Sequence, residues 1–547
     1  MKRTGLSVRK VDEDLVRNLV REIGVSEHLA RLLVLRGVRS RNEAEVWLSP
    51  SISQLVSSEL LPDFELARDR IFQAIERQEP VLIWGHDDLD GITATALLYS
   101  VLTGLQARAK YHIPVKGKDK HGLDYRFVEK GETGDIRLII TVDCGITNHQ
   151  DVATLKERGV DVVVTDHHEV IDPLPEAVAV VDPKRPDANY PGPNLTGVGV
   201  ALKLALGLVF EKTGFSPKEF FSVFPDALVL AALGTIADRA PLVGENRVLV
   251  TLGLRQLDKS NLPAVQAVLR AIGAPTGGFT LAGFLKELLP LFASANGIEG
   301  VRHFLDKTPM AAETWVKDLL QRSRAWREEA EKSFVLAGEN VRRGDGILFV
   351  QHPGLSLRAL GSAAAGLREK FGVPAVVMGW RGDAWVGECR GMDSVDLMAL
   401  LRAMRNYFID YGGHKKAAGF SISDEQVAEF IRAAERFAHD NFAPKIVTEP
   451  GPIADAFLPL EKFDGQEVIK LAPFGEGNPQ PVFLSEPTTF VRRESGLVPQ
   501  TNPKVLLLPG RCESLITSGV RYQVLYTVDD RGELTIIDCL SAVESAD

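Results

Sequence analysis

Val162-Val163-Val164-Thr165-Asp166-His167-His168 is the stretch that decides the fold of this chain. An apolar run ends there in an acid and two adjacent histidines. Two other apolar runs end in the same way: Val81-Leu82-Ile83-Trp84 leads into Gly85-His86-Asp87-Asp88-Leu89-Asp90, and Leu138-Ile139-Ile140-Thr141-Val142 leads into Asp143. Each run has the length of a buried strand. Because ligands of parallel α/β sheets collect at the carboxyl ends of the strands, we expect these side chains to meet at one edge.

A fourth apolar run, residues 228–237, stops at Asp238, and we interpret it as a further strand end. The expected metal ligands are then His86, Asp88, Asp90, Asp143, His167 and Asp238. Imidazole and carboxylate together suit divalent transition metals such as Mn²⁺. Six ligands exceed one tetrahedral site, but they suit two ions about 3.5–4 Å apart that share a carboxylate, as in phosphoester hydrolysis. The alternative for any single acid is that it only caps a helix.

Composition bounds the class of protein. The chain has 547 residues, 45% hydrophobic and 25% charged, so we expect three or four globular domains. No apolar stretch reaches 18 residues without a charge, and no signal peptide is evident, so we expect no membrane span. The four cysteines are far apart without a CxxC pair, which favours a reducing cytoplasm.

The net charge of −10 opposes binding of nucleic acid by the chain as a whole. Phosphate contacts drive nucleic-acid binding, so an acidic protein needs a local basic groove. The candidates for such a track are Lys116, Lys118, Lys120, Arg492 and Arg493. The alternative for the lysines is an ordinary solvated loop.

The pattern along the chain predicts an α/β protein with five segments. Residues 1–54 have helical periodicity, and residues 55–275 alternate strand and helix, which predicts a mostly parallel sheet with helices on both faces. Residues 276–342 form a charged helical connector, and residues 343–442 return to strand and helix. Residues 443–547 carry short β-rich runs separated by turns, which is typical of a small barrel.

The motifs resemble those of the DHH phosphoesterases. His86-x-Asp88-x-Asp90-Gly91, Asp143-Cys144-Gly145, Asp166-His167-His168 and Ala237-Asp238 are similar to the four motifs of that family. Gly412-Gly413-His414 with Ala417-Ala418-Gly419 is similar to the signature of the DHH-associated domain. Leu471-Ala472-Pro473-Phe474-Gly475-Glu476-Gly477-Asn478-Pro479 resembles the C-terminal domain of the family's single-strand-specific exonucleases. The resemblance covers nearly the whole chain, but residues 290–297 lack two arginines of the family pattern.

The resemblance implies a role for each segment. Residues 55–275 would be the DHH catalytic domain, residues 343–442 the DHH-associated substrate-binding domain, and residues 443–547 an OB-like nucleic-acid-binding barrel. One ion would take His86, Asp88 and Asp143, and the other Asp90, Asp143, His167 and Asp238. Asp166 would orient a histidine, and His168 would face the scissile phosphate as a catalytic group. Arg390 and His414, with Gly412 and Gly413, would bind substrate phosphate.

The implied activity is 5′→3′ exonucleolytic hydrolysis of single-stranded DNA in recombination and repair, with two Mn²⁺ ions, or Mg²⁺ in their place. The implied partners are single-stranded DNA and a single-strand-binding protein or helicase, and the chain would act as a monomer in the cytoplasm. One alternative is a phosphoesterase for short oligonucleotides or cyclic dinucleotides. The other is a DNA-binding scaffold without activity, but such a scaffold usually loses metal ligands and none is missing here.

Overall fold

The computed structural model describes residues 7–115, 119, 122–129, 135–170, 173–274, 280–392, 394–413, 415–443, 453–493, 496–502, 505–508, 516–517 and 519–541. The chain divides into two compact units, Met1–Leu319 with Pro452–Asp547, and Leu320–Gly451. Helix α16 (Pro309–Glu339) runs from the first unit into the second along the chain.

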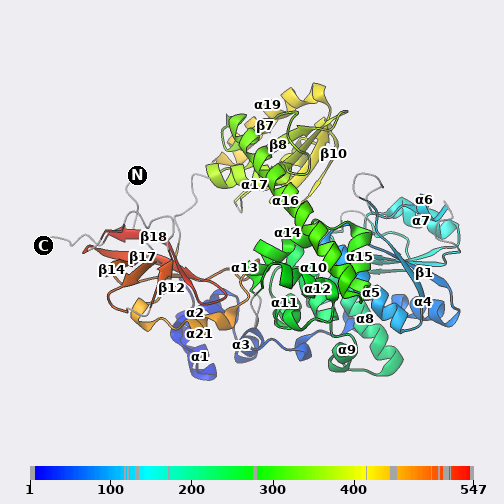
Figure 1. The fold of residues 1–547 in the computed structure, drawn as a ribbon, viewed down its shortest axis with the longest axis horizontal. Coiled ribbons are helices and arrows are strands. Elements are labelled where there is room, and N and C mark those ends of the chain that lie inside the picture. Colours follow the sequence, from blue (N-terminus) through cyan, green and yellow to red (C-terminus); the bar gives the residue numbers. More distant parts are fainter. Residues whose placement is uncertain are drawn as a thin grey trace. The chain divides into compact units, whose positions relative to one another are not determined.

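The first unit contains a parallel five-stranded sheet, as predicted (Figure 1). Its strands, in the order β2-β1-β3-β4-β5, are β1 (Pro80–Trp84), β2 (Arg108–His112), β3 (Leu138–Val142), β4 (Asp161–Thr165) and β5 (Ala179–Val181). All five residues of β3 are buried. Side chains of a strand alternate between the two faces, so complete burial means that both faces are covered.

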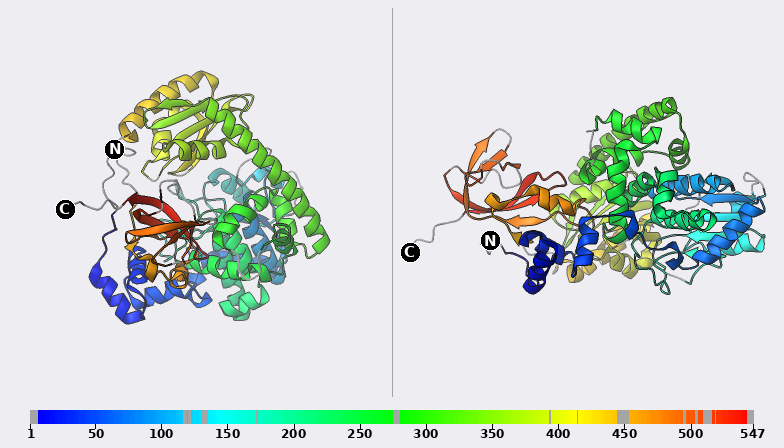
Figure 2. Two further views of the ribbon diagram at one scale, coloured as in Figure 1. Left: turned by 60° about the vertical axis from the view of Figure 1, so that its left-hand side comes forward. Right: turned by 90° about the horizontal axis from the view of Figure 1, so that it is seen from below.

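Helices cover both faces of this sheet (Figure 2). On one face, α6 and α7 pack with Leu82 and Trp84 of β1, while α5 contacts β1 and β3, and α8 contacts β3 and β4. The helices of this part are α4 (Phe64–Glu76), α5 (Leu89–Gly104), α6 (Tyr125–Glu129), α7 (His149–Glu157), α8 (Gly197–Thr213), α9 (Pro217–Val223), α10 (Ala227–Ala237), α11 (Gly244–Gln256), α12 (Pro263–Ala271), α13 (Leu281–Gly283), α14 (Leu289–Phe292) and α15 (Gly297–Leu305), with the short turns η1 (Ile52–Gln54), η2 (Ser58–Leu60), η3 (Leu257–Lys259) and η4 (Phe284–Leu288).

The fourth apolar run is a helix, which corrects our interpretation of it as a strand. Residues 227–237 form α10, and Asp238 is the residue that ends it. Ten of its eleven residues are buried, because it packs against α5, α8 and α11. A helix buried on all sides is apolar all round. Periodicity alone cannot distinguish such a helix from a buried strand, which is why the sequence misled us here.

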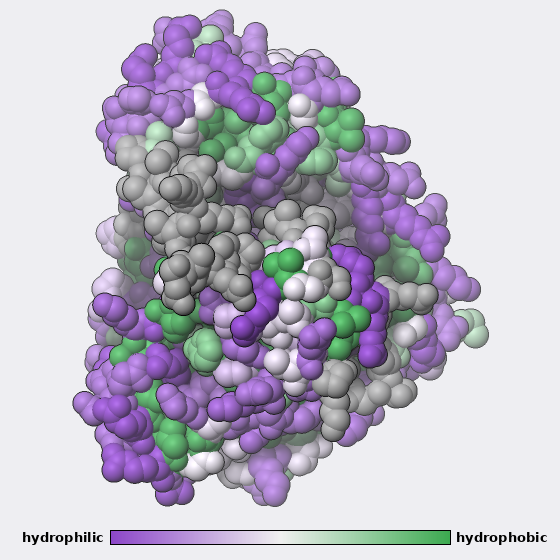
Figure 3. All heavy atoms as spheres, turned by 90° about the vertical axis from the view of Figure 1, so that its left-hand side faces the viewer, coloured by the Kyte–Doolittle hydropathy of each residue, from purple (hydrophilic) through white to green (hydrophobic). Residues whose placement is uncertain are grey.

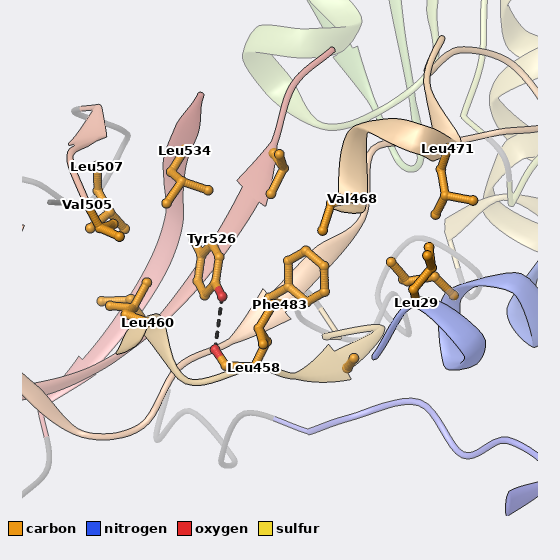
Figure 4. Packing of buried hydrophobic residues seen from close by; sticks show 14 of the residues in the cluster. Leu29, Leu458, Leu460, Val468, Leu471, Phe483, Val505, Leu507, Tyr526 and Leu534 are labelled. Carbon is orange, nitrogen blue, oxygen red and sulfur yellow. Dashed lines mark hydrogen bonds between the residues drawn. The ribbon is translucent and has the colours of Figure 1, made fainter. Parts of the chain in front are cut away.

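The two ends of the chain share one hydrophobic cluster. Helices α1 (Glu13–Ile23), α2 (Glu27–Leu35) and α3 (Arg41–Leu48) lie at the N-terminus. Figure 4 shows Leu29 of α2 near Leu471 and Val468 of the C-terminal segment. Deeper in the cluster, the Tyr526 hydroxyl donates a hydrogen bond to the Leu458 carbonyl at 2.9 Å. The N-terminal helices therefore complete the core of the C-terminal strands.

The C-terminal strands pair in a ring. They are β12 (Ala456–Phe457), β13 (Val482–Leu484), β14 (Thr488–Arg493), β15 (Gly496–Pro499), β16 (Leu507–Leu508), β17 (Arg521–Val528) and β18 (Leu534–Ser541), with η6 (Leu460–Lys462), α21 (Gly465–Val468) and η7 (Ile469–Leu471) between them. The pairing runs β17-β14-β15-β16-β18 and returns to β17. All ring pairs are antiparallel except β16 with β18. A sheet that closes on itself removes its exposed edges.

The second unit is a separate α/β layer. Its six-stranded sheet has the order β10-β11-β9-β8-β7-β6. The elements are β6 (Arg342–Gly344), β7 (Ile347–Gln351), α17 (Leu360–Phe371), β8 (Ala375–Trp380), β9 (Trp385–Arg390), α18 (Leu397–Ala403), η5 (Arg405–Tyr407), β10 (Phe408–Gly413), β11 (Ala417–Ile422) and α19 (Asp424–Asn441). Two hydrophobic clusters form within it, one lined by α17 and the other by α18 and α19. The unit therefore has cores of its own.

The surface agrees with a composition rich in charge. On the face drawn in Figure 3, hydrophilic residues predominate and hydrophobic ones form small separate patches. In the described part of the chain, no single helix is long and apolar enough to cross a membrane. By length and composition alone, the bent pair α9 and α10 would qualify.

The shared terminal cluster predicts the effect of shortening a side chain in it. Leu29 has no exposed surface, so Leu29→Ala should lower the free energy of unfolding by about 2–5 kcal/mol through lost burial and a residual cavity. Leu66→Ala, at a side chain that is 53% exposed on α4, should change it by less than about 0.5 kcal/mol. Urea unfolding followed by circular dichroism measures both, and equal effects would contradict a common core.

Candidate metal centre

The six expected ligands converge at the carboxyl edge of the five-stranded sheet. Ligand atoms of His86, Asp88 and Asp143 all lie within 4.8 Å of one another, and so do those of Asp90, His167 and Asp238. The Asp143 carboxylate contacts both sets. Its Oδ2 is 3.5 Å from His86 Nδ1, and its Oδ1 is 3.0 Å from His167 Nε2. One carboxylate thus faces two adjacent sets of donors, as a bridging ligand would.

A third set overlaps the other two. Ligand atoms of Asp143, His167 and His168 also lie within 4.8 Å of one another. His168, however, directs its Nδ1 to Asp166 Oδ1 at 2.7 Å, and its side chain remains 43% exposed. This nitrogen is already engaged, so His168 is better suited to face a substrate than to join the ligands.

Asp88 serves two purposes at once. Its Oδ1 accepts a hydrogen bond from the Gly91 amide at 2.9 Å and so caps α5. Its Oδ2 lies 3.1 Å from His86 Nδ1, on the side of the candidate centre. Capping and metal binding are therefore compatible roles for this residue, because a carboxylate has two oxygens.

Asp90 is fixed by the amino end of a second helix. Its two carboxylate oxygens accept hydrogen bonds from the amides of Gly197 and Val198, at 2.7 and 2.9 Å, where α8 begins. The positive end of a helix dipole favours such an anion. A Cβ atom on Gly197 would lie 2.4 Å from Asp143 Cβ, so only glycine allows this close approach. A Cβ on Gly234 would likewise lie 2.6 Å from Asp90 Oδ1.

Asp143 has an unusual backbone and an unsatisfied side-chain atom. Its φ of 61° is left-handed, a conformation that is uncommon for a residue other than glycine and often marks a functional site. Its Oδ2 is buried and makes no hydrogen bond within the described part of the chain. His86 Nδ1, 3.5 Å away, is only a long contact, and a buried carboxylate oxygen without a well-formed hydrogen bond needs a cation or another partner. The donor set therefore fits divalent cations.

The pKa values show how strongly the carboxylates act on the histidines. Burial lowers the pKa of His86, but Asp143 and Asp88 outweigh it and raise that pKa to about 11. For His167, burial is likewise outweighed by Asp143, and the pKa is raised to about 10. Burial and Asp143 raise the pKa of Asp90 well above its usual value. Without metal, the raised pKa values of His86, His167 and Asp90 thus favour bound protons, which offset carboxylate charge that cations would otherwise neutralise.

Asp166 lies behind the ligands and organises its neighbours. It is buried and accepts hydrogen bonds from the amides of Ile146 and His167, at 2.9 and 2.8 Å, as well as from His168. Burial raises its pKa, but the hydrogen bond with His168 outweighs this and lowers it to about 2. An ionised Asp166 fixes the ring orientation of His168.

Asp182 is a buried acid close enough to Asp166 and His167 for their charges to affect its pKa, and the sequence reasoning missed it. It follows β5 and is fully buried beside β4, and burial raises its pKa to about 7. Its Oδ2 makes no hydrogen bond to any described residue. The signal was present in the sequence, since Val180-Val181-Asp182 repeats the pattern of an apolar run that ends in an acid.

The predicted phosphate-binding residues belong to the second unit. Arg390 ends β9, and its NH1 donates hydrogen bonds to Glu388 Oε2 at 2.8 Å and to the Cys389 carbonyl at 2.9 Å. Gly412 and Gly413 end β10. Gly413 has a φ of 132°, and a Cβ there would lie 2.5 Å from Ala418 Cα, so the turn requires glycine. His414, Lys116, Lys118 and Lys120 lie outside the described residues.

Arg492 and Arg493 are exposed at the end of β14. Successive side chains of a strand point to opposite faces, so only one of the two can belong to a single track across either face.

The raised histidine pKa values predict proton release when metal binds. Metal-bound imidazole must be neutral, so each divalent cation displaces protons from His86 and His167. We expect release of about two protons per chain at neutral pH, and an Mn²⁺ affinity that rises with pH and falls as pH decreases. Calorimetric titration with Mn²⁺ in buffers of different ionisation enthalpy measures this. His439→Gln, at an exposed histidine paired with Asp345, should leave proton release unchanged, and a pH-independent affinity would contradict the assignment.

Comparison with known proteins agrees with this geometry. The model of the DHH family, N-terminal domain, matches residues 80–235, and that of the DHHA1 domain matches residues 344–440. The single-stranded-DNA-specific exonuclease RecJ of Bacillus subtilis (strain 168) is 30% identical over 501 residues, which cover 88% of this chain and 61% of that protein. The protein of the same name from Escherichia coli (strain K12) is 27% identical, with 88% and 86% covered.

A solved structure has the same fold along almost the whole chain. The crystal structure of RecJ in complex with Mn²⁺ from Thermus thermophilus matches with a TM-score of 0.79 and 25% identity, and the match covers 98% of this chain and 78% of that one. This chain spans 61% of the length of its Bacillus subtilis relative. With both domain models matched and RecJ proteins similar along 88% of its length, the chain belongs to the DHH family of phosphoesterases and is a relative of RecJ.

Proposed function

We propose that this chain is a metal-dependent exonuclease that hydrolyses single-stranded DNA from the 5′ end, in recombination and repair. The observation that carries the proposal is the pair of adjacent donor sets, His86–Asp88–Asp143 and Asp90–His167–Asp238, with Asp143 in contact with both. Relatives named single-stranded-DNA-specific exonuclease support the substrate and the reaction. The direction of cleavage rests on the family resemblance.

We propose two cations, one for each donor set, with Asp143 as the shared ligand. Mixed imidazole and carboxylate donors favour Mn²⁺ over Mg²⁺, and a related structure that contains Mn²⁺ supports a divalent cation here. When bound, such ions lower the pKa of a coordinated water and neutralise charge on a phosphoryl group.

His168 is proposed as the group that faces the scissile phosphate. Burial lowers its pKa, but the hydrogen bond with Asp166 outweighs this and raises it, which favours the protonated ring. Nδ1 is engaged by Asp166, which leaves Nε2 to donate to a non-bridging oxygen or to the leaving group. No protein nucleophile is required.

The remaining parts are proposed to bind the strand. Arg390 would hold a phosphate through its planar guanidinium, with Gly412, Gly413 and His414 near it in sequence. The closed ring of five C-terminal strands supports an OB-like barrel, a common binder of single strands, with Arg492 or Arg493 on its track. Residues 55–275 and 343–442 are proposed as the catalytic and substrate-binding domains.

We also propose that the chain acts as a monomer in the cytoplasm, on strands made accessible by a helicase or a single-strand-binding protein. Cys144 and Cys389 are free thiols, which supports a reducing compartment.

Asp143→Ala should abolish cleavage, since both donor sets lose a ligand. We expect a loss of at least about 10³-fold in kcat, because activation of water and neutralisation of charge fail together. The assay uses single strands labelled at the 5′ or 3′ end, with a duplex control and Mn²⁺. Asp151→Ala, at a buried acid of α7 outside the donor sets, is the matched control. More than a tenth of the wild-type turnover in folded Asp143→Ala would exclude the shared-ligand assignment.

The same assay separates the alternative substrates. An exonuclease should cleave a long single strand with a lower KM than a dinucleotide or a cyclic dinucleotide, because more phosphates and bases are held. A preference for the dinucleotide would favour the oligonucleotide phosphoesterase.

Glu388 predicts a second effect, on substrate affinity. Its carboxylate forms an ion pair with the Arg390 guanidinium, and both side chains are partly exposed. Glu388→Gln should free Arg390 for phosphate and lower KM for single-stranded DNA roughly threefold, in keeping with the modest energy of such pairs. Asp383→Asn, which alters the exposed Arg381–Asp383 pair of the same unit, should leave KM unchanged. An unchanged or higher KM in Glu388→Gln would show that Arg390 does not hold the phosphate.

A further inference from the structure

Asp238 is held differently from the ligands around it. Its side chain is 36% exposed, whereas those of Asp90, Asp143 and His167 are at most 8% exposed. It ends α10, and Arg239 then takes a left-handed φ of 56° as the chain turns away. The Asp238 amide donates to the Gly234 carbonyl at 3.0 Å, so α10 anchors its backbone, and the next hydrogen bonds to other elements along the chain are those of Pro241 and Leu242.

Pro241 and Leu242 are held from two sides: Asn246 Nδ2 of α11 donates to the Pro241 carbonyl at 3.2 Å, and the C-terminal part of the chain makes the other contacts. The Leu242 amide donates a hydrogen bond to the Glu476 carbonyl at 2.8 Å. Gly477 lies against Pro241 so closely that a Cβ there would be 3.0 Å from Pro241 Cβ. Both contacts come from residues 471–479, which we call the docking loop and which our sequence reasoning had used only as a family marker.

The docking loop is kept in shape by Asn478. This residue is fully buried, and its Nδ2 donates to the carbonyls of Leu471 and Pro473, both at 2.8 Å. Its Oδ1 accepts a hydrogen bond from Arg36 Nε at 2.6 Å. The Asn478 side chain thus links two carbonyls within the docking loop and binds Arg36, the residue that ends α2.

Arg247 of α11 also binds the docking loop through hydrogen bonds. Its guanidinium donates to the carbonyls of Lys470, Leu471 and Ala472, at 2.9–3.3 Å, and to that of Trp47. It also lies over the Trp47 ring, 4.6 Å from the centroid. The side chain is 3% exposed. Such a buried cation is costly unless its donors are satisfied, so this contact favours one fixed position of the loop.

Asp530, in the turn between β17 and β18, adds a third attachment. Its Oδ1 accepts from the Phe474 amide at 2.9 Å, and its Oδ2 accepts from the Leu281 amide at 3.1 Å. Leu281 begins α13, in the part of the unit that follows the sheet. A single carboxylate therefore joins the strands of the C-terminal ring, the docking loop and a helix outside the ring.

We propose that the docking loop is a positioning element for the metal ligand Asp238, acting through Pro241 and Leu242. The C-terminal segment would then govern cation affinity at the set Asp90–His167–Asp238, in addition to binding the strand. Coupling of this kind is reciprocal, so cation occupancy would in turn strengthen docking. The inference rests on the proposed function for the identity of the ligands.

Gly477→Ala in the full chain tests the contact directly. The added methyl would press on Pro241 and strain a residue with φ of 69°. We expect one of two Mn²⁺ equivalents to bind roughly tenfold more weakly, as when groups that orient metal ligands are altered. Gly519→Ala is the matched control, because φ there is 82° and a Cβ would meet nothing within 4 Å. Electron paramagnetic resonance of free Mn²⁺ gives both affinities without an activity assay.

A second pair of variants guards against simple misfolding. Asp530→Ala should weaken the same Mn²⁺ equivalent, and Asp530→Asn, which keeps one acceptor, should restore part of the affinity. Equal Mn²⁺ binding by wild type, Gly477→Ala and Asp530→Ala overturns the positioning role. If Gly477→Ala does not fold, the Asp530 pair decides alone. Failure of the wild type to bind Mn²⁺ overturns the proposed function instead, so the two failures are distinct.

Discussion

The structure of the centre depends on one constraint, the concentration of carboxylates at the carboxyl edge of a parallel sheet. Asp88, Asp90, Asp143 and Asp238 would repel one another in a site of low dielectric unless cations separate them. Burial and the neighbouring carboxylates raise the pKa of Asp90 well above its usual value, and the same carboxylates outweigh burial and attract protons to His86 and His167, whose pKa values rise to about 11 and about 10. The sheet beneath this edge is largely apolar, since all five residues of β3 and four of the five in each of β1 and β4 are buried.

Among the described residues, backbone amides rather than arginine or lysine side chains hold those carboxylates. Amides at the start of α8 bind Asp90, and the Gly91 amide binds Asp88. Backbone donors have fixed positions and add no full positive charge, so the carboxylates keep their affinity for metal. Gly197 of α8 lies so close to Asp143, and Gly234 of α10 so close to Asp90, that a Cβ atom at either glycine would clash.

Sequence patterns predict the sheet and its edge because short apolar runs that end in acids and histidines are typical of buried parallel strands leading into a site. They fail for α10, where an apolar helix and an apolar strand look alike, and they overlook Asp182, whose preceding run is short. They also assign separate segments to the two ends of the chain, whose side chains pack into one cluster. Contacts between residues more than 400 positions apart, such as Arg36 with Asn478, leave no periodic signal in the sequence.

The polar contacts of the docking loop differ in kind from the hydrophobic cluster beside it. Hydrophobic packing is non-directional and tolerates small shifts, whereas the Arg247, Asn478 and Asp530 side chains each require particular backbone groups at hydrogen-bond distance. The cluster of α1–α3 with the C-terminal strands thus supplies stability. The buried polar contacts specify one position for residues 471–479, and through Leu242 and Pro241 for the segment after Asp238. A ligand of a metal ion must be placed within about 0.5 Å of its productive position, and directional hydrogen bonds add to the precision that packing gives.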